Sequence, residues 1–261
     1  MNRALLATCV AAAARAAEII RDRSSSRETI QWEVKSRADY VSDVDRAAEH
    51  AIGDMILSRH ADAKILGEEL SPAMNDRAGL VFVVDPLDGT TNFLHGVPWY
   101  AVSVAAMVDD VLRAGVVLNV ANGELFTATA GGGARLGGQP IAVSPIVDPL
   151  RSLIGTGFPF KGGPLVDEYL RILPNIMRET SGLRRPGAAS LDLAAVACGR
   201  FEGFWELELS AWDIAAGILL IREAGGIVTD LHGAECPVAK TGLVAGCETM
   251  HAWLMERVRR V

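Results

Sequence analysis

The chain has 261 residues, half of them apolar, so it can bury a large core as one large domain or as two closely joined halves. Its net charge is −7, with no cluster of Lys and Arg. Binding to nucleic acid or to an anionic membrane relies on such clusters, so we expect neither as a main partner.

Neither the N-terminal segment nor the cysteine spacing indicates a secreted protein. Four scattered cysteines without a C-x-x-C spacing predict reduced, mostly buried thiols. No stretch reaches the roughly 18 consecutive apolar residues of a membrane span. The Ala-rich start resembles a short signal-peptide core, but Arg15 and Glu18 interrupt it, while Ile19 and Ile20 continue a helical pattern. We therefore expect a first helix and a cytoplasmic protein.

Hydrophobic spacing predicts a mixed first half. The expected elements are a helix over 1–20, a strand at 32–35, a helix over 44–59, a brief strand at 65–66, a strand at 81–84 buried on both faces, strands at 100–108, 111–119 and 124–130 in a hairpin meander, and a glycine-rich turn at 131–138. Two prolines within 144–149 mark the expected seam between halves, which divides the chain into 1–145 and 146–261.

The second half alternates strands and helices. Strands are expected at 151–155, 203–207, 227–229 and 243–245, and helices at 165–180, 188–197, 211–224 and 248–260. Glycines stop two of these helices, at Gly199 and at Gly225.

The string D-P-L-D-G-T-T-N-F at 85–93 concentrates the chemistry. Asp85 follows the buried strand directly, and Asp88 comes three residues later across a turn fixed by Pro86, so both carboxylates can face one ion or bridge two. The carbonyl of Leu87 could join them. Residues 89–91 are expected to open a short helical turn whose free N–H groups form a phosphate cradle. The alternative to a metal site for the first five residues is an ordinary D-x-x-D-G turn with only a structural role.

Further acids stand elsewhere, each with a structural alternative. Glu68 and Glu69 alone would be read as a solvated pair. Asp213 follows Ser210 in a capping-box pattern, and Asp45 lies at the start of its helix, where acids are favoured. Only their combination with the string at 85–93 indicates one polynuclear metal site.

Several carboxylates in one pocket repel one another unless cations neutralise them. A set of Asp and Glu without Cys or His favours Mg²⁺, which is typically held by carboxylates together with a substrate phosphate. The sequence therefore predicts phosphoryl transfer or phosphoester hydrolysis.

This combination, in this order, resembles the inositol monophosphatase family of magnesium-dependent, lithium-sensitive phosphatases over nearly the whole chain. The motifs that carry the resemblance are V-S-D-V-D at 41–45, G-E-E-L at 67–70, the string at 85–93, G-T-G-F-P-F at 155–160, R-R-P-G-A-A-S-L-D-L at 184–193 and W-D-I-A-A-G at 212–217. The resemblance implies a layered αβαβα sandwich of the α/β class, with an α+β N-terminal half and an α/β C-terminal half, and a homodimer.

The resemblance also implies roles for individual residues. Metal ions would be held by Glu68, Asp85, the carbonyl of Leu87, Asp88 and Asp213. Thr90, supported by Asp45, would position the attacking water and help to deprotonate it, and Glu69 would orient ligands and water. Substrate contacts would come from Asp88, Gly89, Thr90, Gly187, Ala188, Ala189, Glu206 and Asp213. Family members commonly carry Thr or Ser where Ala188 stands, so this chain departs from the pattern at that contact.

The implied reaction is the hydrolysis of a small polyol or sugar phosphate, inositol 1-phosphate first, by direct attack of water. Two or three Mg²⁺ ions would serve it, with Mn²⁺ as a substitute and Li⁺ and Ca²⁺ as inhibitors. Fructose 1,6-bisphosphate, histidinol phosphate and a nucleotide 3′-phosphate are the alternative substrates, since only the substrate wall distinguishes them. A regulatory or interaction module without activity is the alternative of another class.

Overall fold

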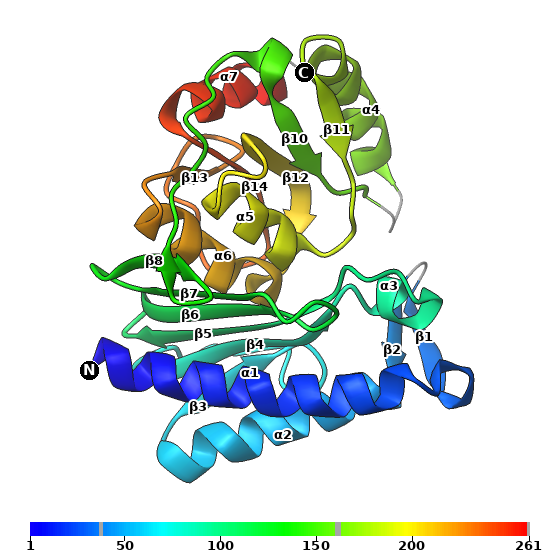
Figure 1. Ribbon diagram of the computed structural model, residues 1–261, viewed down its shortest axis with the longest axis vertical. Helices are drawn as coiled ribbons and strands as arrows, with labels where there is room; N and C mark the ends of the chain where they lie inside the picture. The colour runs from blue at the N-terminus through cyan, green and yellow to red at the C-terminus, as the bar shows by residue number, and fades with distance from the viewer. Residues whose placement is uncertain (37–38, 160–162, 260–261) are drawn as a thin grey trace.

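The computed structural model describes residues 1–36, 39–159 and 163–259. Its elements stack in five layers, helices, sheet, helices, sheet, helices, as Figure 1 shows from bottom to top. This is the expected αβαβα sandwich of the α/β class. The expected division between residues 145 and 146 falls between the two sheets, and it stays a prediction.

The first layer consists of two long helices, α1 (Asn2–Ser24) and α2 (Asp43–Arg59). Small alanines on α1 let the helix lie close to the strands of the first sheet, and Ile20 of α1 and Ile52 of α2 are fully buried. The short 3-10 helix η1 (Arg27–Thr29) and the hairpin of β1 (Trp32–Ser36) and β2 (Asp39–Ser42) connect the two helices.

The first sheet has seven strands in simple sequence order. They are β3 (Lys64–Gly67), β4 (Leu80–Asp88), β5 (Ala101–Val108), β6 (Val111–Asn119), β7 (Leu125–Thr129), β8 (Gly133–Leu136) and β9 (Gln139–Pro140), with α3 (Thr90–His95) between β4 and β5. Only β3 and β4 pair in parallel, and the remaining pairs are antiparallel, as the predicted meander requires.

The central helices α5 (Ala189–Ala197) and α6 (Ala211–Glu223) lie between the two sheets. Both are apolar almost all round, which is the pattern of a helix buried on every side. Gly115 on β6 would bring a Cβ within 3.2 Å of the backbone of Ala216, so the glycine allows α6 to lie directly on the first sheet.

The second sheet has the order β11-β10-β12-β14-β13. Its strands are β10 (Leu153–Thr156), β11 (Gly182–Arg184), β12 (Gly203–Leu209), β13 (Ile227–Asp230) and β14 (Thr241–Gly246), and η2 (Pro149–Arg151) precedes them. The outer helices α4 (Pro164–Met177) and α7 (Glu248–Arg259) cover its far face, where Trp205 and Ile172 are fully buried.

Several local predictions needed correction. The strand expected at 81–84 continues as β4 to Asp88, because Asp85 pairs with Ser103 and Asp88 pairs with Ala101 on either side of a bulge. The segment expected to be a plain turn at 131–138 contains β8, and the short strands β2, β9 and β11 were not predicted. Short strands with few apolar residues carry little periodicity, which explains why they were missed.

Two further expectations concern the whole chain. All four cysteines are free thiols, with Cys9 and Cys236 buried and the other two half-buried. Within the described residues, no helix is both long and apolar enough to cross a bilayer.

Candidate active site

A cavity of about 380 Å³ collects most of the predicted site residues. The predicted residues that line it are Glu68, Asp85, Leu87, Asp88, Gly89, Thr90, Gly187, Ala188, Ala189, Glu206 and Asp213. Asp45 lies behind Thr90, and Glu69 is half-buried outside the lining. Tyr40, Arg185 and Asp192 also line the cavity, although the sequence analysis did not single them out.

The bulge at the end of β4 brings two acids to this cavity. Pro86 has no N–H to donate, and the chain leaves the regular ladder between Asp85 and Asp88. Within the bulge, the N–H of Leu87 donates to Oδ1 of Asp85 at 3.0 Å. The bulge therefore fixes the Asp85 side chain and places both acids at the cavity.

Asp85 is almost fully buried among other acids. Its side chain is 1 % exposed. Burial raises the pKa of its carboxyl well above the usual range, and the charges of Glu68, Asp88 and Asp213 raise it further. Four carboxylates from three separate segments are therefore close enough to repel one another at this point.

Asp88 is held by the start of α5. Its Oδ2 accepts from the backbone N–H of Ser190 at 2.7 Å and from the Ser190 hydroxyl at 2.5 Å. Burial raises the pKa of Asp88 to about 6, although these hydrogen bonds and the charge of Arg185 act to lower it. The contact ties the bulge of the first sheet to the helix layer between the sheets.

Asp213 and Asp45 both act as helix caps, the structural alternative that the sequence left open. Oδ2 of Asp213 accepts from the N–H of Ser210 at 2.7 Å, and Oδ2 of Asp45 accepts from the N–H of Ser42 at 2.8 Å. Each acid is thus the third residue of its helix in a capping box. Asp213 also lines the cavity, so capping and a place at the site coexist in one side chain.

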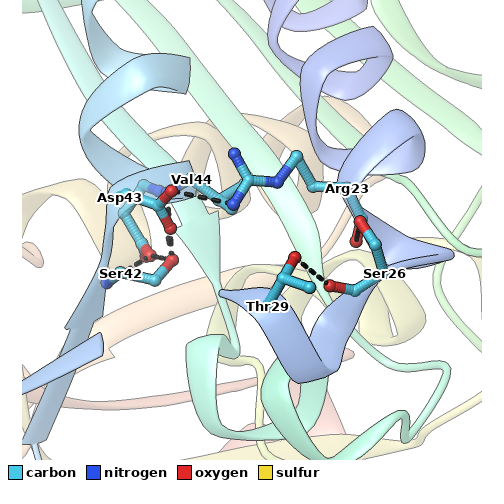
Figure 2. A network of polar contacts seen from close by, with 7 residues as sticks. Arg23, Ser26, Thr29, Ser42, Asp43 and Val44 are labelled. Atoms are coloured by element: carbon cyan, nitrogen blue, oxygen red, sulfur yellow. Dashed lines mark hydrogen bonds and ion pairs between the residues drawn. The ribbon is translucent and has the colours of Figure 1, made fainter. Parts of the chain in front are cut away.

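The start of α2 is anchored from α1, as Figure 2 shows. Arg23, near the end of α1, donates to Oδ2 of Asp43 at 2.8 Å. The Ser42 hydroxyl accepts from the N–H of Val44 at 3.2 Å, and nearby Thr29 donates to the carbonyl of Ser26 at 2.8 Å. The Arg23 and Ser42 contacts hold the helix start that carries Asp45, whereas the Thr29 contact closes the turn of η1.

The Thr90 hydroxyl occupies the first position of α3. It lies within hydrogen-bonding distance of Oδ1 of Asp45 (2.9 Å) and of the carbonyl of Leu87 (3.0 Å). Asp45 itself is fully buried, and burial raises the pKa of its carboxyl despite hydrogen bonds from Ser42 and Thr90. The structure therefore brings the predicted pair of Thr90 and Asp45 into direct contact.

The loop with Glu68 and Glu69 is held by Glu49, a residue of α2 that is 2 % exposed. Its two carboxylate oxygens accept from the backbone N–H groups of Glu69 (2.7 Å) and Leu70 (3.0 Å). A Cβ on Gly67 would lie 2.1 Å from Oε1 of Glu49. Glycine at this position thus makes room for the carboxylate that fixes the loop.

The facing wall is formed by residues 185–190 and is tied to α3. The side-chain amide of Asn92 donates to the carbonyls of Trp99 (2.7 Å) and Pro186 (2.9 Å). Gly89 has a positive φ of 87°, and a Cβ there would lie 2.9 Å from the carbonyl of Trp99 and 3.2 Å from the Ala188 side chain. Only glycine fits both requirements, so the two walls meet closely at this point.

Glu206 of β12 completes the cavity. Burial raises the pKa of its carboxyl well above the usual range, and Asp213 and Asp192 add to the increase. A Cβ on Gly157 would lie 2.1 Å from the Glu206 carboxyl atoms, so this glycine leaves the space that the side chain occupies.

The carboxylates do not form a finished ligand cage in this structure. Among the residues described, no three or more His, Cys, Asp or Glu side chains are arranged to hold a metal ion. Instead, oxygens of Asp85, Asp88 and Asp213 accept hydrogen bonds from protein donors. The chemical character of the donors, carboxylate oxygen without nitrogen or sulfur, nevertheless fits a hard divalent cation.

The comparison with known proteins decides the family. A family model described as "Inositol monophosphatase family" matches residues 1–261. The chain belongs to the inositol monophosphatase family. It is 42% identical to an inositol-1-monophosphatase of Rhizobium meliloti, over 98% of this chain and 97% of the relative, and 43% identical to the Nus factor SuhB of Pseudomonas aeruginosa, over 93% and 91%.

Solved structures agree with this assignment. The extragenic suppressor protein suhB from Bartonella henselae superposes with a TM-score of 0.94 at 41% identity, covering 98% of this chain and 99% of that one. The predicted resemblance and fold are therefore confirmed. Membership in the inositol monophosphatase family supports a phosphatase that needs divalent metal ions.

Several residues that line the cavity or hold its lining in place carried no recognisable signal alone. Ser190, Asn92 and Asp192 lie inside the quoted motifs, yet their polar types are common in helices and turns. Glu49 had one usable signal, because it lies one helical turn after Asp45 and next to the apolar Ala48 on the buried side of α2.

Proposed function

We propose that the protein is a magnesium-dependent phosphomonoester hydrolase acting on a small polyol or sugar phosphate, inositol 1-phosphate first. The observation that carries this proposal is the convergence of Glu68, Asp85, Asp88 and Asp213 at one cavity, where their charges raise the pKa of Asp85. Their repulsion is relieved when cations bind, and cations also attract a phosphate.

The residues proposed to hold Mg²⁺ are Glu68, Asp85, the carbonyl of Leu87, Asp88 and Asp213. When bound, the ions would neutralise the phosphate charge, make water more acidic and hold the attacking and leaving oxygens in line. Hard oxygen ligands favour Mg²⁺, with Mn²⁺ as a substitute. Two or three ions per site, and inhibition by Li⁺ and Ca²⁺, are part of the same proposal.

Thr90 and Asp45 are proposed to handle the attacking water. The Asp45 carboxylate can accept the Thr90 proton across 2.9 Å, which leaves a lone pair of the hydroxyl oxygen directed at a water in the cavity. As that water attacks phosphorus, its proton passes to the Thr90 oxygen while the Thr90 proton passes to Asp45, and the bond from phosphorus to the alcohol oxygen breaks, so no phospho-enzyme forms. Glu69 is proposed to act from outside the cavity by orienting its neighbours.

The substrate would lie between the bulge and the facing wall. Asp88, Gly89 and Thr90 would contact the phosphate end together with Asp213, and Gly187, Ala188, Ala189 and Glu206 would contact the remainder. A carboxylate such as Glu206 accepts hydrogen bonds from neighbouring hydroxyls, which supports a polyhydroxylated substrate.

Phosphate release from four compounds tests the proposal: inositol 1-phosphate, fructose 1,6-bisphosphate, histidinol phosphate and adenosine 3′,5′-bisphosphate, each with Mg²⁺, with EDTA and with added Li⁺. We expect metal-dependent, Li⁺-sensitive turnover that is highest for inositol 1-phosphate. Dominant turnover of histidinol phosphate would contradict the polyol assignment. If no phosphate is released from any of the four compounds, the enzymatic proposal for these substrates is contradicted.

A second candidate function is regulatory. Several relatives, including the 43% identical Pseudomonas protein, are named Nus factor SuhB, which suggests association with the transcription machinery. The net charge of −7 favours a protein partner over direct contact with nucleic acid. Co-purification with the transcription machinery from cells, compared between the wild type and a catalytically inactive variant, would test a role that is independent of turnover.

The remaining expectations are part of the proposal. We propose a homodimer that works in the cytoplasm without a nucleic acid or membrane partner. Equilibrium sedimentation would test the dimer, since a monomer at micromolar concentration would contradict it.

A further inference from the structure

Arg185 is the only cationic side chain among the described residues that line the cavity. It is half-buried, and its guanidinium carbon lies 5.2 Å from the centroid of the Phe158 ring. A Cβ on Gly187 would lie 2.8 Å from one of its terminal nitrogens, so the guanidinium lies against the wall itself. Arg185 therefore belongs to the cavity and is not a surface residue that happens to be near it.

The charges around Arg185 identify the end of the cavity at which it lies. Burial lowers the pKa of its guanidinium, and the charges of Glu206 and Asp192 oppose this most strongly. At the proposed metal end, burial raises the pKa of Asp85 most, and the charges that add to it are those of Glu68, Asp88 and Asp213, not that of Arg185. The charge of Asp88 also acts on Arg185, but less than those of Glu206 and Asp192, so we assign the guanidinium to the wall that carries Glu206.

Asp192 adds a second negative charge at the same end. It is 1 % exposed, and its Oδ1 accepts from the Trp99 indole N–H at 3.1 Å. Without Arg185, Glu206 and Asp192 would form a strongly negative wall that attracts a cation. The single positive charge of Arg185 offsets part of theirs, and the wall keeps hydrogen-bond acceptors together with guanidinium donors.

We propose that Arg185 determines the substrate class: it offsets part of the charge of Glu206 and Asp192, so that the wall favours an uncharged, hydroxyl-rich group over a cationic amine. This inference rests on the proposed phosphatase function. The guanidinium would donate to a substrate hydroxyl while Glu206 accepts from one, and an ammonium group at the same place would be repelled by Arg185.

The test compares inositol 1-phosphate with histidinol phosphate, which carries an amine. The measured quantity is the ratio of their kcat/KM values in the wild type, Arg185→Met and Arg185→Lys. Methionine keeps an unbranched apolar stem against Phe158 but removes the charge. We expect the ratio to shift toward the amine by about tenfold in Arg185→Met, a modest effect for one unit charge a few ångströms away. Lysine should retain most of the wild-type ratio.

Arg184→Met is the matched control. Arg184 precedes Arg185 directly, but its side chain is exposed and it does not line the cavity. The ratio of kcat/KM values for the two phosphate esters should be the same in Arg184→Met as in the wild type. If Arg185→Met lowers both kcat/KM values equally, Arg185 is only structural and the inference is wrong. A selective loss of fructose 1,6-bisphosphate turnover would also overturn it, because Arg185 would then bind a second phosphate.

Calorimetric binding separates this inference from the proposed function. Dissociation constants for the two phosphate esters are measured with Ca²⁺ in place of Mg²⁺, so that hydrolysis does not interfere. If the wild type hydrolyses neither ester but the ratio of dissociation constants still shifts in Arg185→Met, the phosphatase proposal fails and the role of Arg185 stands. An unchanged ratio of dissociation constants would overturn the role of Arg185.

Discussion

The Thr90 hydroxyl lies 2.9 Å from Oδ1 of Asp45 and thereby joins the start of α3 to the start of α2. The other oxygen of Asp45 caps α2 through Ser42, so the carboxylate cannot rotate without losing that cap. A hydroxyl carries one proton, and Thr90 can donate it either to Asp45 or to the carbonyl of Leu87. The geometry therefore provides a fixed acceptor and an alternative one for a single proton.

Replacing Thr90 with valine removes this proton while keeping the shape of the side chain. We expect kcat to fall by about 100-fold or more, the usual contribution of a positioned acid or base. Thr90→Ser keeps the hydroxyl and should keep most of the activity. Steady-state kinetics at saturating Mg²⁺ measure both variants, and near-normal kcat in Thr90→Val would exclude the proposed role.

The buried carboxylate of Glu49 gives a prediction for metal binding. Glutamine offers one acceptor instead of two and directs an NH₂ group at a backbone N–H, so Glu49→Gln should loosen the loop with Glu68. We expect the affinity for Mg²⁺ to fall roughly 10-fold or more, as for other residues that hold a metal ligand in place.

Calorimetry measures that affinity directly, and kcat at saturating Mg²⁺ should largely recover if Glu49 only positions the loop. Asp54→Asn is the matched control, because Asp54 is exposed on the same helix. Unchanged Mg²⁺ affinity in a folded Glu49→Gln protein would contradict the positioning role.

The variant Gly157→Ala should displace Glu206, because the carboxyl atoms of Glu206 lie 2.1 Å from the position of the new Cβ. We expect kcat/KM for inositol 1-phosphate to fall roughly 10- to 100-fold, because a shift of about 1 Å in a substrate contact has effects of this size. Mg²⁺ affinity should stay unchanged, since Glu206 is not a proposed metal ligand. Loss of Mg²⁺ binding in this variant would show that Glu206 acts on the metal end instead.

Gly53→Ala serves as the control for the added methyl group. Gly53 lies inside α2, and its new Cβ would have an ordinary contact of 3.7 Å with Ile65. This variant should be fully active and more stable by about 0.5–1 kcal/mol, because alanine favours helix over glycine. Thermal unfolding measures the gain.

Much of this architecture could be predicted from the sequence because the signals are local. The continuous apolar run at 81–84 identifies a strand buried on both faces. The acids that follow it indicate that the candidate site lies at the end of this strand. The layer order came from the family resemblance and could not have followed from periodicity. The bulge at Pro86 was missed because it depends on pairing with β5, which is not a local property.

The partners of residues that act through distant contacts could not be predicted from the sequence, even where burial could, as for Glu49. Glu49 holds a loop about 20 residues away, and Ser190 holds Asp88 from 102 residues away. Nothing near either residue in the sequence indicates its partner. Conversely, the capping pattern at Asp213 was correctly recognised, although it was treated as an alternative to a site role, and the structure shows that the two are compatible.

The most direct test of the central claim is a calorimetric titration of Mg²⁺ into the wild type, Asp88→Asn and Asp213→Asn. Asparagine at 213 keeps an oxygen that can cap the N–H of Ser210, so the fold should survive. We predict Mg²⁺ binding at millimolar concentration in the wild type, and loss of at least one binding step together with nearly abolished turnover in both variants. Absence of binding to the wild type, or near-normal binding and kcat in either variant, would contradict the account.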